Sequence, residues 1–278
     1  MKNLPIAFIG GGNMARSLIG GLLAGGGDPD RIWVAEPDAG QREFLRSRFG
    51  VHTGADNADI AAKAAVVVLA VKPQIIREVT LRLTPVIQAR QPLVISIAAG
   101  VREPDLRYWL GGGALALVRT MPNTPALVGS AATALFANEF VSEERRQLAE
   151  SLLRAVGVTV WVNDESLLDT VTALSGSGPA YFFLVMEALE QAALNLGLDA
   201  DIARLLTLQT AFGAAKMALE SVESPASLRM RVTSPGGTTE QALAVLRTGE
   251  IETLFVKALE AACQRSRELG DLLGERQP

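Results

Sequence analysis

The chain has 278 residues, of which 49% are hydrophobic and 20% charged, and its formal net charge is −4. This composition is typical of a globular protein with one large or two modest domains and excludes an intrinsically disordered chain. With an acidic balance and no basic run longer than Arg145 and Arg146, the sequence predicts no nucleic-acid partner.

Strand-like and helix-like segments alternate over about the first 160 residues. Short runs rich in Val and Ile predict strands at 5–9, 31–35, 65–71, 93–98 and 115–119, with a further pair at 131–136 and 157–162. Helices are expected at 13–25, 39–49, 74–89, 103–110 and 142–154. Because continuous apolar runs suit strands that are covered on both faces, residues 1–162 are predicted to form a Rossmann-type, doubly wound α/β domain with a parallel sheet.

Beyond Asp164 the strand pattern stops and only helices are expected. They are predicted at 166–174, 179–196, 199–221, 225–231, 238–247 and 251–273. Residues 163–278 are therefore predicted to form an all-helical domain. Within it, Tyr181, Leu184, Val185 and Leu189 recur at helical spacing, which favours core or dimer contacts over an aromatic cofactor site.

A glycine-rich turn opens the first expected helix. Gly10, Gly12 and Ala15 give the G-x-G-x-x-A form of the dinucleotide fingerprint directly after the first strand. The first Gly allows a tight turn, the second lets backbone amides approach a pyrophosphate, and the small third residue lets the helix pack closely. A purely structural glycine turn is the alternative.

The second strand is followed by Glu36, where an acid usually binds the ribose hydroxyls. An acid there favours NAD and repels a 2′-phosphate, although Arg16 and Arg42 offer compensating charge. The alternative is an exposed loop acid. Lys72 follows another strand, and either a phosphate contact or simple solvation explains it equally well.

The inventory of reactive side chains excludes several kinds of chemistry. His52 and Cys263 are the single His and Cys of the chain, so no Cys/His metal site and no Ser-His or Cys-His pair is expected. His52, which lies in an expected turn and short strand, is interpreted as a solvated side chain. No run approaches the ~18 apolar residues of a membrane span, and one cysteine fits a cytoplasmic protein with no membrane partner.

Six motifs make the chain resemble the pyrroline-5-carboxylate reductase family. They are GGGNMA, AVKP, SIAAG, MPNTPA, LSGSGPAYFF and VTSPGGTTEQAL, in that order and spacing, and the resemblance covers essentially all residues. It implies reduction of 1-pyrroline-5-carboxylate to L-proline by NAD(P)H, the last step of proline biosynthesis. It also implies a homodimer through the helical domain, often assembled further into rings.

The resemblance also implies roles for individual residues. NADPH is the expected cofactor, while Glu36, where many NADPH-preferring relatives carry a small polar residue, leaves NADH open. Cofactor contacts are expected from Gly10, Gly11, Gly12, Asn13, Met14, Glu36, Asn57, Ala70, Val71, Lys72, Pro73, Ala98 and Asn123. Substrate contacts are expected from Ser175, Gly236, Gly237, Thr238 and Thr239.

The SPGGTT stretch has a physical reason to bind a carboxylate. Gly236 and Gly237 lack a Cβ, which lets backbone amides converge at the start of the helix from Thr238 onward. The Thr239 hydroxyl is the expected hydrogen-bond partner of the ring nitrogen and the candidate catalytic group. A plain helix cap is the alternative.

Two other functions stay open at this point. One is a non-catalytic dinucleotide-sensing dimer, in which SPGGTT is only a cap. The other is a β-hydroxyacid dehydrogenase-like reductase, against which the helix expected at 179–196 counts, because it carries no lysine. An imine needs no strong general acid, since it can be protonated before reduction.

Overall fold

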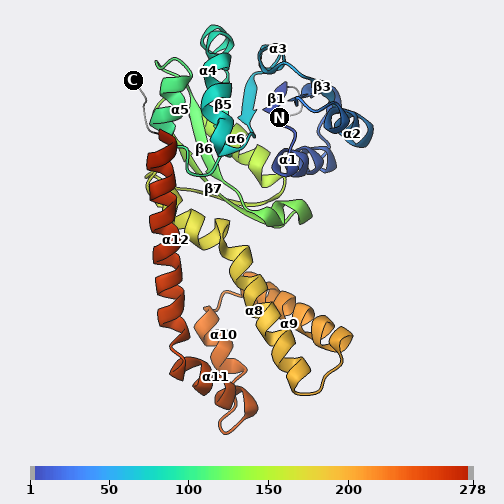
Figure 1. The fold of residues 1–278 in the computed structure, drawn as a ribbon, viewed down its shortest axis with the longest axis vertical. Coiled ribbons are helices and arrows are strands. Elements are labelled where there is room, and N and C mark those ends of the chain that lie inside the picture. Colours follow the sequence, from blue (N-terminus) through green and yellow to red (C-terminus); the bar gives the residue numbers. More distant parts are fainter. Residues whose placement is uncertain (1–3, 275–278) are drawn as a thin grey trace. The chain divides into compact units, whose positions relative to one another are not determined.

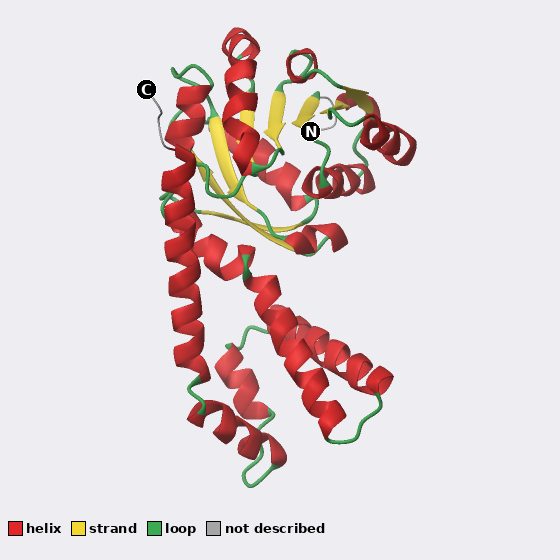
Figure 2. Cartoon of the chain, in the orientation of Figure 1, coloured by secondary structure: helices red, strands yellow, loops and turns green. Residues whose placement is uncertain are grey.

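The computed structural model of the chain describes residues 4–274. They form two compact units, one comprising the residues up to Ser177 together with those from Ala261 onward, and the other Gly178–Glu260. Among the described residues, strands occur only in the first unit (Figure 2). The predicted combination of an α/β sheet with an all-helical region is therefore confirmed.

The first unit is built on one eight-stranded sheet (Figure 1), whose strand order is β3-β2-β1-β4-β5-β6-β7-β8. All neighbouring strands are parallel except β6 and β7, which are antiparallel. The strands are β1 (Ile6–Ile9), β2 (Ile32–Ala35), β3 (His52–Gly54), β4 (Val66–Leu69), β5 (Leu93–Ser96), β6 (Leu117–Met121), β7 (Ala131–Ala137) and β8 (Gly157–Trp161).

Helices cover both faces of the sheet, as the continuous apolar strands predict. Along β1, Ile6 and Phe8 point into one core and Ala7 and Ile9 into the other. The first core lies under α1 (Asn13–Ala24), α2 (Ala39–Phe49) and α6 (Glu143–Arg154), and the second under α3 (Asn57–Ala61), α4 (Pro73–Arg90) and α5 (Glu103–Trp109). Successive side chains of a strand face opposite sides, so a strand between two helical layers has no polar side.

Three features of this unit differ from the predicted elements. Helix α3 was not predicted, because five residues are too few to show a helical period. The reversed direction of β7 was not predicted either; residues 124–128 between β6 and β7 form only a short 3-10 turn (Thr124–Val128), whereas a parallel return needs a longer crossover. The helix expected at 166–174 is instead α7 (Leu167–Val171) followed by a π-helical turn (Thr172–Gly176).

The segment after β8 packs with the sheet unit. Arg119 on β6 is 5% exposed and forms an ion pair with Glu165 at 2.8 Å. Asp169 on α7 accepts a 2.6 Å hydrogen bond from Ser266, in the part of α12 (Ile251–Gly274) that belongs to this unit. The first compact unit thus extends to Ser177. The domain boundary predicted at 162–163 stays a prediction.

The helical unit contains α8 (Gly178–Asn195), α9 (Ala200–Glu220), α10 (Pro225–Arg231), α11 (Thr238–Thr248) and the first part of α12. Helices α8 and α9 pack against each other, yet their only fully buried residues are Gly178 and Ala203. Large apolar side chains of both helices therefore remain exposed. No helix in the described part of the chain is long and apolar enough to cross a membrane.

Candidate functional site

The turn after β1 has the geometry that only glycine adopts easily. Gly10 has a φ of 103°, and its amide donates to the Ala35 carbonyl at 2.8 Å. A Cβ at Gly10 would lie 2.7 Å from the carbonyl oxygen of Ala70. The turn is therefore pressed against the end of β4, and a side chain at this position would force it open.

The N-terminus of α1 is free to bind an anion. Its N-cap is Gly12, and no side chain caps the helix. A Cβ at Gly12 would meet no protein atom within 4 Å, so the protein itself does not require glycine there. The first-turn amides, which have no partner within a helix, and the positive end of the helix dipole suit a pyrophosphate. Asn13 and Met14 form this first turn, as expected for a cofactor-binding loop.

Glu36 is buried rather than exposed, so the interpretation of it as an exposed loop acid is wrong. Its side chain lies directly after β2, and the residue is 8% exposed. One carboxylate oxygen accepts from the Gly11 amide at 3.0 Å and the other from the Asp38 amide at 3.1 Å. The acid is thus fixed against the glycine turn at the edge of the sheet where the dinucleotide is expected.

The two nearby arginines do not neutralise this carboxylate. The Arg16 guanidinium donates to the Gly11 carbonyl at 3.0 Å, and that of Arg42 donates to the carbonyls of Glu36 and Pro37 at 2.8 and 2.7 Å. Among the described residues, neither arginine forms an ion pair with Glu36. Both arginines instead bind the backbone of the two turns.

The other residues predicted to touch the cofactor follow the carboxyl ends of three strands. Asn57 is the first residue of α3, after β3; Ala98 is buried beyond β5, and its amide donates to the Ser96 hydroxyl at 3.3 Å. Lys72 is exposed at the N-cap of α4. The AVKP residues Ala70, Val71, Lys72 and Pro73 connect β4 to α4. In parallel α/β sheets this edge is where ligands bind.

Asn123 lies at the same edge, two residues beyond β6. Its side-chain amide donates to the Ser175 carbonyl at 3.0 Å, and its side-chain oxygen accepts from the Ala132 amide at 2.9 Å. The structure therefore brings MPNTPA and LSGSG together. The Ser175 hydroxyl donates to the Val171 carbonyl at 3.1 Å, so it is engaged within its own turn.

In the helical unit, two of the expected carboxylate-binding amides are already bonded. Gly236 has a φ of 70°, and its amide donates to a Glu240 carboxylate oxygen at 2.7 Å. The Gly237 amide donates to the Ser234 carbonyl at 3.0 Å. A Cβ at Gly237 would lie 3.0 Å from that same carbonyl. The glycine pair thus shapes the turn rather than presenting its own amides.

The amides that stay available are those of the first turn of α11. The N-cap of this helix is Gly237, and no side chain caps it. The hydroxyls of Thr238 and Thr239 form no hydrogen bond within the described residues. The plain-cap alternative thus accounts for Gly236 and Glu240 only. Three first-turn amides and two threonine hydroxyls remain for a small anionic ligand.

Comparisons with known proteins identify the family. A family model described as "Pyrroline-5-carboxylate reductase dimerisation" matches residues 165–269, and one described as "NADP oxidoreductase coenzyme F420-dependent" matches residues 5–100. The chain is 50% identical over 275 residues to pyrroline-5-carboxylate reductase of Pseudomonas aeruginosa, covering 99% of this chain and 100% of the relative. The chain belongs to the pyrroline-5-carboxylate reductase family.

Solved structures of this family have the same fold. Pyrroline-5-carboxylate reductase of Coxiella burnetii, 52% identical, superposes with a TM-score of 0.92 over 96% of this chain and 98% of the other. The Plasmodium falciparum pyrroline carboxylate reductase with NADP bound, 28% identical, gives a TM-score of 0.85 over 97% and 99%. The resemblance drawn from the six motifs is confirmed.

Several contacts of this pyrroline-5-carboxylate reductase fold could not be found from its sequence. The pairing of Asn123 with Ser175 joins residues far apart in the chain, and no local pattern marks it. The bond from the Gly236 amide to Glu240 has a weak local signal, because an acid in the first turn of a helix often reaches back to cap it. Sequence reasoning treated that pattern as an alternative to binding, whereas the bond to Gly236 leaves the first turn of α11 without a side-chain cap.

The single histidine of the chain has a structural role. His52 lies in β3, where its ring stacks on Trp33 with centroids 4.1 Å apart and its Nε2 is 3.6 Å from Asp30. It is thus only partly solvated, and it lies away from the carboxyl edge. The described residues contain no cluster of His, Cys, Asp and Glu that could hold a metal ion.

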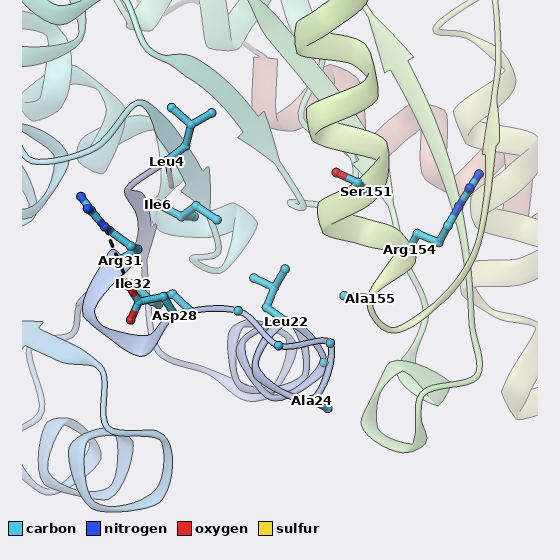
Figure 3. Close-up of a pocket in the computed structure, with 14 residues that line it drawn as sticks. Leu4, Ile6, Leu22, Ala24, Asp28, Arg31, Ile32, Ser151, Arg154 and Ala155 are labelled. Atoms are coloured by element: carbon cyan, nitrogen blue, oxygen red, sulfur yellow. Dashed lines mark ion pairs between the residues drawn. The ribbon is translucent and has the colours of Figure 1, made fainter. Parts of the chain in front are cut away.

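A cavity of about 650 Å³ opens elsewhere in the first unit (Figure 3). It is lined by Leu4 and Ile6 at the start of β1, Ile32 at the start of β2 and Leu22 on α1, with an Asp28–Arg31 ion pair at its rim. These strands begin there, so the cavity lies at the edge opposite the glycine turn. Ligands of parallel sheets bind at the carboxyl edge, and we assign the cavity no part in the reaction.

Proposed function

We propose that this chain reduces the C=N bond of 1-pyrroline-5-carboxylate to give L-proline, with NAD(P)H as the reductant. Membership of the family across nearly the whole chain supports the reaction. The observation that carries the assignment of the substrate site is the uncapped N-terminus of α11 beside two unbonded threonine hydroxyls. A cyclic imine with a carboxylate needs both an anion site and a weak hydrogen-bonding group.

The binding of the dinucleotide and of the substrate can each be assigned to residues of this chain. The uncapped N-terminus of α1 and the turn Gly10–Met14 would hold the pyrophosphate, and Glu36 the adenosine ribose. When bound, the dinucleotide supplies the hydride. The amides of Thr238, Thr239 and Glu240 would hold the substrate carboxylate, with the Thr239 hydroxyl toward the ring nitrogen.

The residues proposed to hold the substrate include no His, Lys or Tyr, and this fits the chemistry of an imine. Hydride addition to a ketone leaves an alkoxide that needs a proton donor, usually His, Lys or Tyr. An imine is protonated before reduction, and the amine product keeps its proton. Preorganised amides and one hydroxyl therefore suffice, with positioning as the main contribution. Helix α8 has no lysine, which disfavours a β-hydroxyacid dehydrogenase-like reaction.

The test of this function is oxidation of the dinucleotide with and without substrate. Adding 1-pyrroline-5-carboxylate to the chain and NADPH or NADH should make the nicotinamide absorbance fall, with L-proline as the product. A dinucleotide-sensing protein would bind the cofactor yet give no substrate-dependent loss of absorbance, and that result would reject the enzyme.

We also propose that NADH is used more efficiently than NADPH. The supporting observation is that the Glu36 carboxylate is buried, hydrogen-bonded by two amides and left without an ion pair among the described residues. A fixed negative charge at the ribose attracts its hydroxyls and repels a 2′-phosphate. This proposal departs from the NADPH expectation drawn from the resemblance and takes the NADH alternative that Glu36 left open.

Glu36→Gln should shift the preference toward NADPH. Removing the charge while keeping the side-chain length is expected to raise the NADPH/NADH ratio of kcat/KM by roughly 10-fold or more. The control is Glu43→Gln, because Glu43 is an exposed acid on α2 whose carboxylate pairs with Arg46. A ratio that moves equally in both variants, or not at all in Glu36→Gln, contradicts the assignment.

We further propose that the chain forms a homodimer through the helical unit and acts in the cytoplasm. The dimerisation model covers residues 165–269, and α8 and α9 expose Phe182, Phe183, Leu205 and Phe212 at 61–68%. Large apolar side chains gathered on two packed helices and exposed to this extent are typical of a protein interface. Assembly of such dimers into rings stays a prediction.

Leu205→Glu should convert the dimer to a monomer. A charge on the exposed apolar face of α9 would be buried without a partner in the interface, which is strongly unfavourable. Light scattering after size-exclusion chromatography measures the mass. Leu81→Glu on α4, where Leu81 is 50% exposed, should leave the mass unchanged; an unchanged mass for both variants would place the interface elsewhere.

A further inference from the structure

The side chain of Asn123 uses both of its polar ends inside the protein. Its amide nitrogen donates to the Ser175 carbonyl at 3.0 Å, while its oxygen accepts from the Ala132 amide of β7 at 2.9 Å. Each end keeps one further hydrogen-bonding position, but these two bonds already fix the orientation of the side chain. Asn123 therefore connects β7 and the LSGSG turn.

The turn held by Asn123 is irregular. Between Thr172 and Gly176 the helix widens to π geometry, with the Ser177 amide donating to the Thr172 carbonyl at 2.8 Å. Met121, the last residue of β6, packs so closely that a Cβ at Gly176 would lie 2.5 Å from its terminal methyl carbon. Single π-helical turns occur often at functional sites. Here the turn is pressed onto the carboxyl end of β6.

The hydroxyl groups of this turn have different partners. Thr172 donates to the Leu168 carbonyl at 2.7 Å, and Ser175 donates to the Val171 carbonyl at 3.1 Å. The half-buried hydroxyl of Ser177 has no partner in the part of the chain that the structure describes. Ser177 follows directly after the π-helical turn. Of these three hydroxyls, that of Ser177 is the one whose proton has no acceptor within the described residues.

We propose that Asn123 is a positioning residue that holds the π-helical turn at the carboxyl edge of the sheet, and that the turn presents the Ser177 hydroxyl to the nicotinamide carboxamide. The inference rests on the proposed function, since it places the nicotinamide at this edge. Where the resemblance implies a substrate contact from Ser175, the proposal gives this motif a cofactor contact from Ser177. A hydroxyl donates and accepts hydrogen bonds, which matches a carboxamide.

The test measures binding without substrate, so it does not depend on which imine is reduced. Dissociation constants for NADH and for ADP-ribose, which lacks the nicotinamide, are measured by titration calorimetry. Ser177→Ala is expected to raise the dissociation constant for NADH roughly 3- to 10-fold, because one neutral hydrogen bond is lost. The dissociation constant for ADP-ribose should stay unchanged. Ser175→Ala should change neither constant.

Asn123 is tested by coupling to Ser177. Asn123→Ala and Asn123→Asp should each weaken the binding of NADH, relative to that of ADP-ribose, about as much as Ser177→Ala does. The Asp variant keeps the oxygen that accepts from the Ala132 amide and loses only the donor to Ser175. It therefore separates the loss of this donor from a general loss of the fold. Combined with Ser177→Ala, either should add little further loss, because both changes remove the same contact.

A structural asparagine provides the control. Asn138 is 5% exposed and joins the amide of Leu117, at the opposite end of β6, to the Glu103 carboxylate. Asn138→Ala should lower Tm without changing the ratio of the dissociation constants for NADH and ADP-ribose. An unchanged ratio in Ser177→Ala, or losses that multiply in the Asn123 and Ser177 double variant, would overturn the proposal.

Discussion

Gly12→Ala should fold normally and lose most of its affinity for the dinucleotide. A Cβ at Gly12 meets no protein atom within 4 Å, and the residue has a φ of −71° that any residue adopts. The added methyl group would instead occupy the space through which a pyrophosphate reaches the first-turn amides of α1. We expect the dissociation constant to rise roughly 30-fold, about 2 kcal/mol, as for other overpacked sites.

Gly20→Ala on the same helix is the matched control. Its added Cβ would lie 3.5 Å from Phe49, an ordinary contact. Alanine is a better helix former than glycine by about 1 kcal/mol, so this variant should be slightly more stable and bind the dinucleotide as before. Calorimetric titration measures the affinity of both variants for the dinucleotide, and a thermal melt measures their stability. Unchanged affinity in Gly12→Ala would remove the N-terminus of α1 from the cofactor site.

Thr239→Ala should lower kcat with little effect on the KM for 1-pyrroline-5-carboxylate. The first-turn amides that hold the carboxylate belong to the backbone and survive the change, whereas the hydroxyl proposed for the ring nitrogen is lost. We expect kcat to fall roughly 100-fold, the lower end of the range for a single donor aimed at a reacting group. Steady-state kinetics at saturating dinucleotide measure both constants.

Two further variants separate chemistry from structure at this site. Thr239→Ser keeps a hydroxyl and should recover most of the activity. Thr233→Ala removes a hydroxyl that donates to the Arg229 carbonyl at 2.7 Å, so it should leave kcat unchanged. If Thr239→Ala turns over at the wild-type rate, the hydroxyl has no part in the reaction and the amides act alone.

The strands and the glycine turn could be predicted because their signals are local. Phe8 and Ile9 face different cores, so β1 appears in the sequence as an unbroken apolar run. The positive φ of Gly10 follows directly from its place in the fingerprint. Such features depend on neighbours within a few residues, and the local order of residue types is enough to predict them.

The remaining features depend on contacts between distant segments. The antiparallel pairing of β7 with β6 is a choice between two directions that an apolar run does not encode. The burial of Glu36 depends on the Gly11 amide, 25 residues away. The π-helical turn before Ser177 packs through Gly176 against Met121, which lies in a distant segment of the chain. Sequence reasoning placed these residues near a site without giving their partners.

The most direct test of the reaction follows the hydride itself. The chain is incubated with 1-pyrroline-5-carboxylate and NADH carrying deuterium at the transferable position of the nicotinamide, and the product is analysed by mass spectrometry. The account predicts L-proline with a single deuterium on the carbon that was part of the C=N bond. Proline without deuterium, or no proline at all, would contradict it.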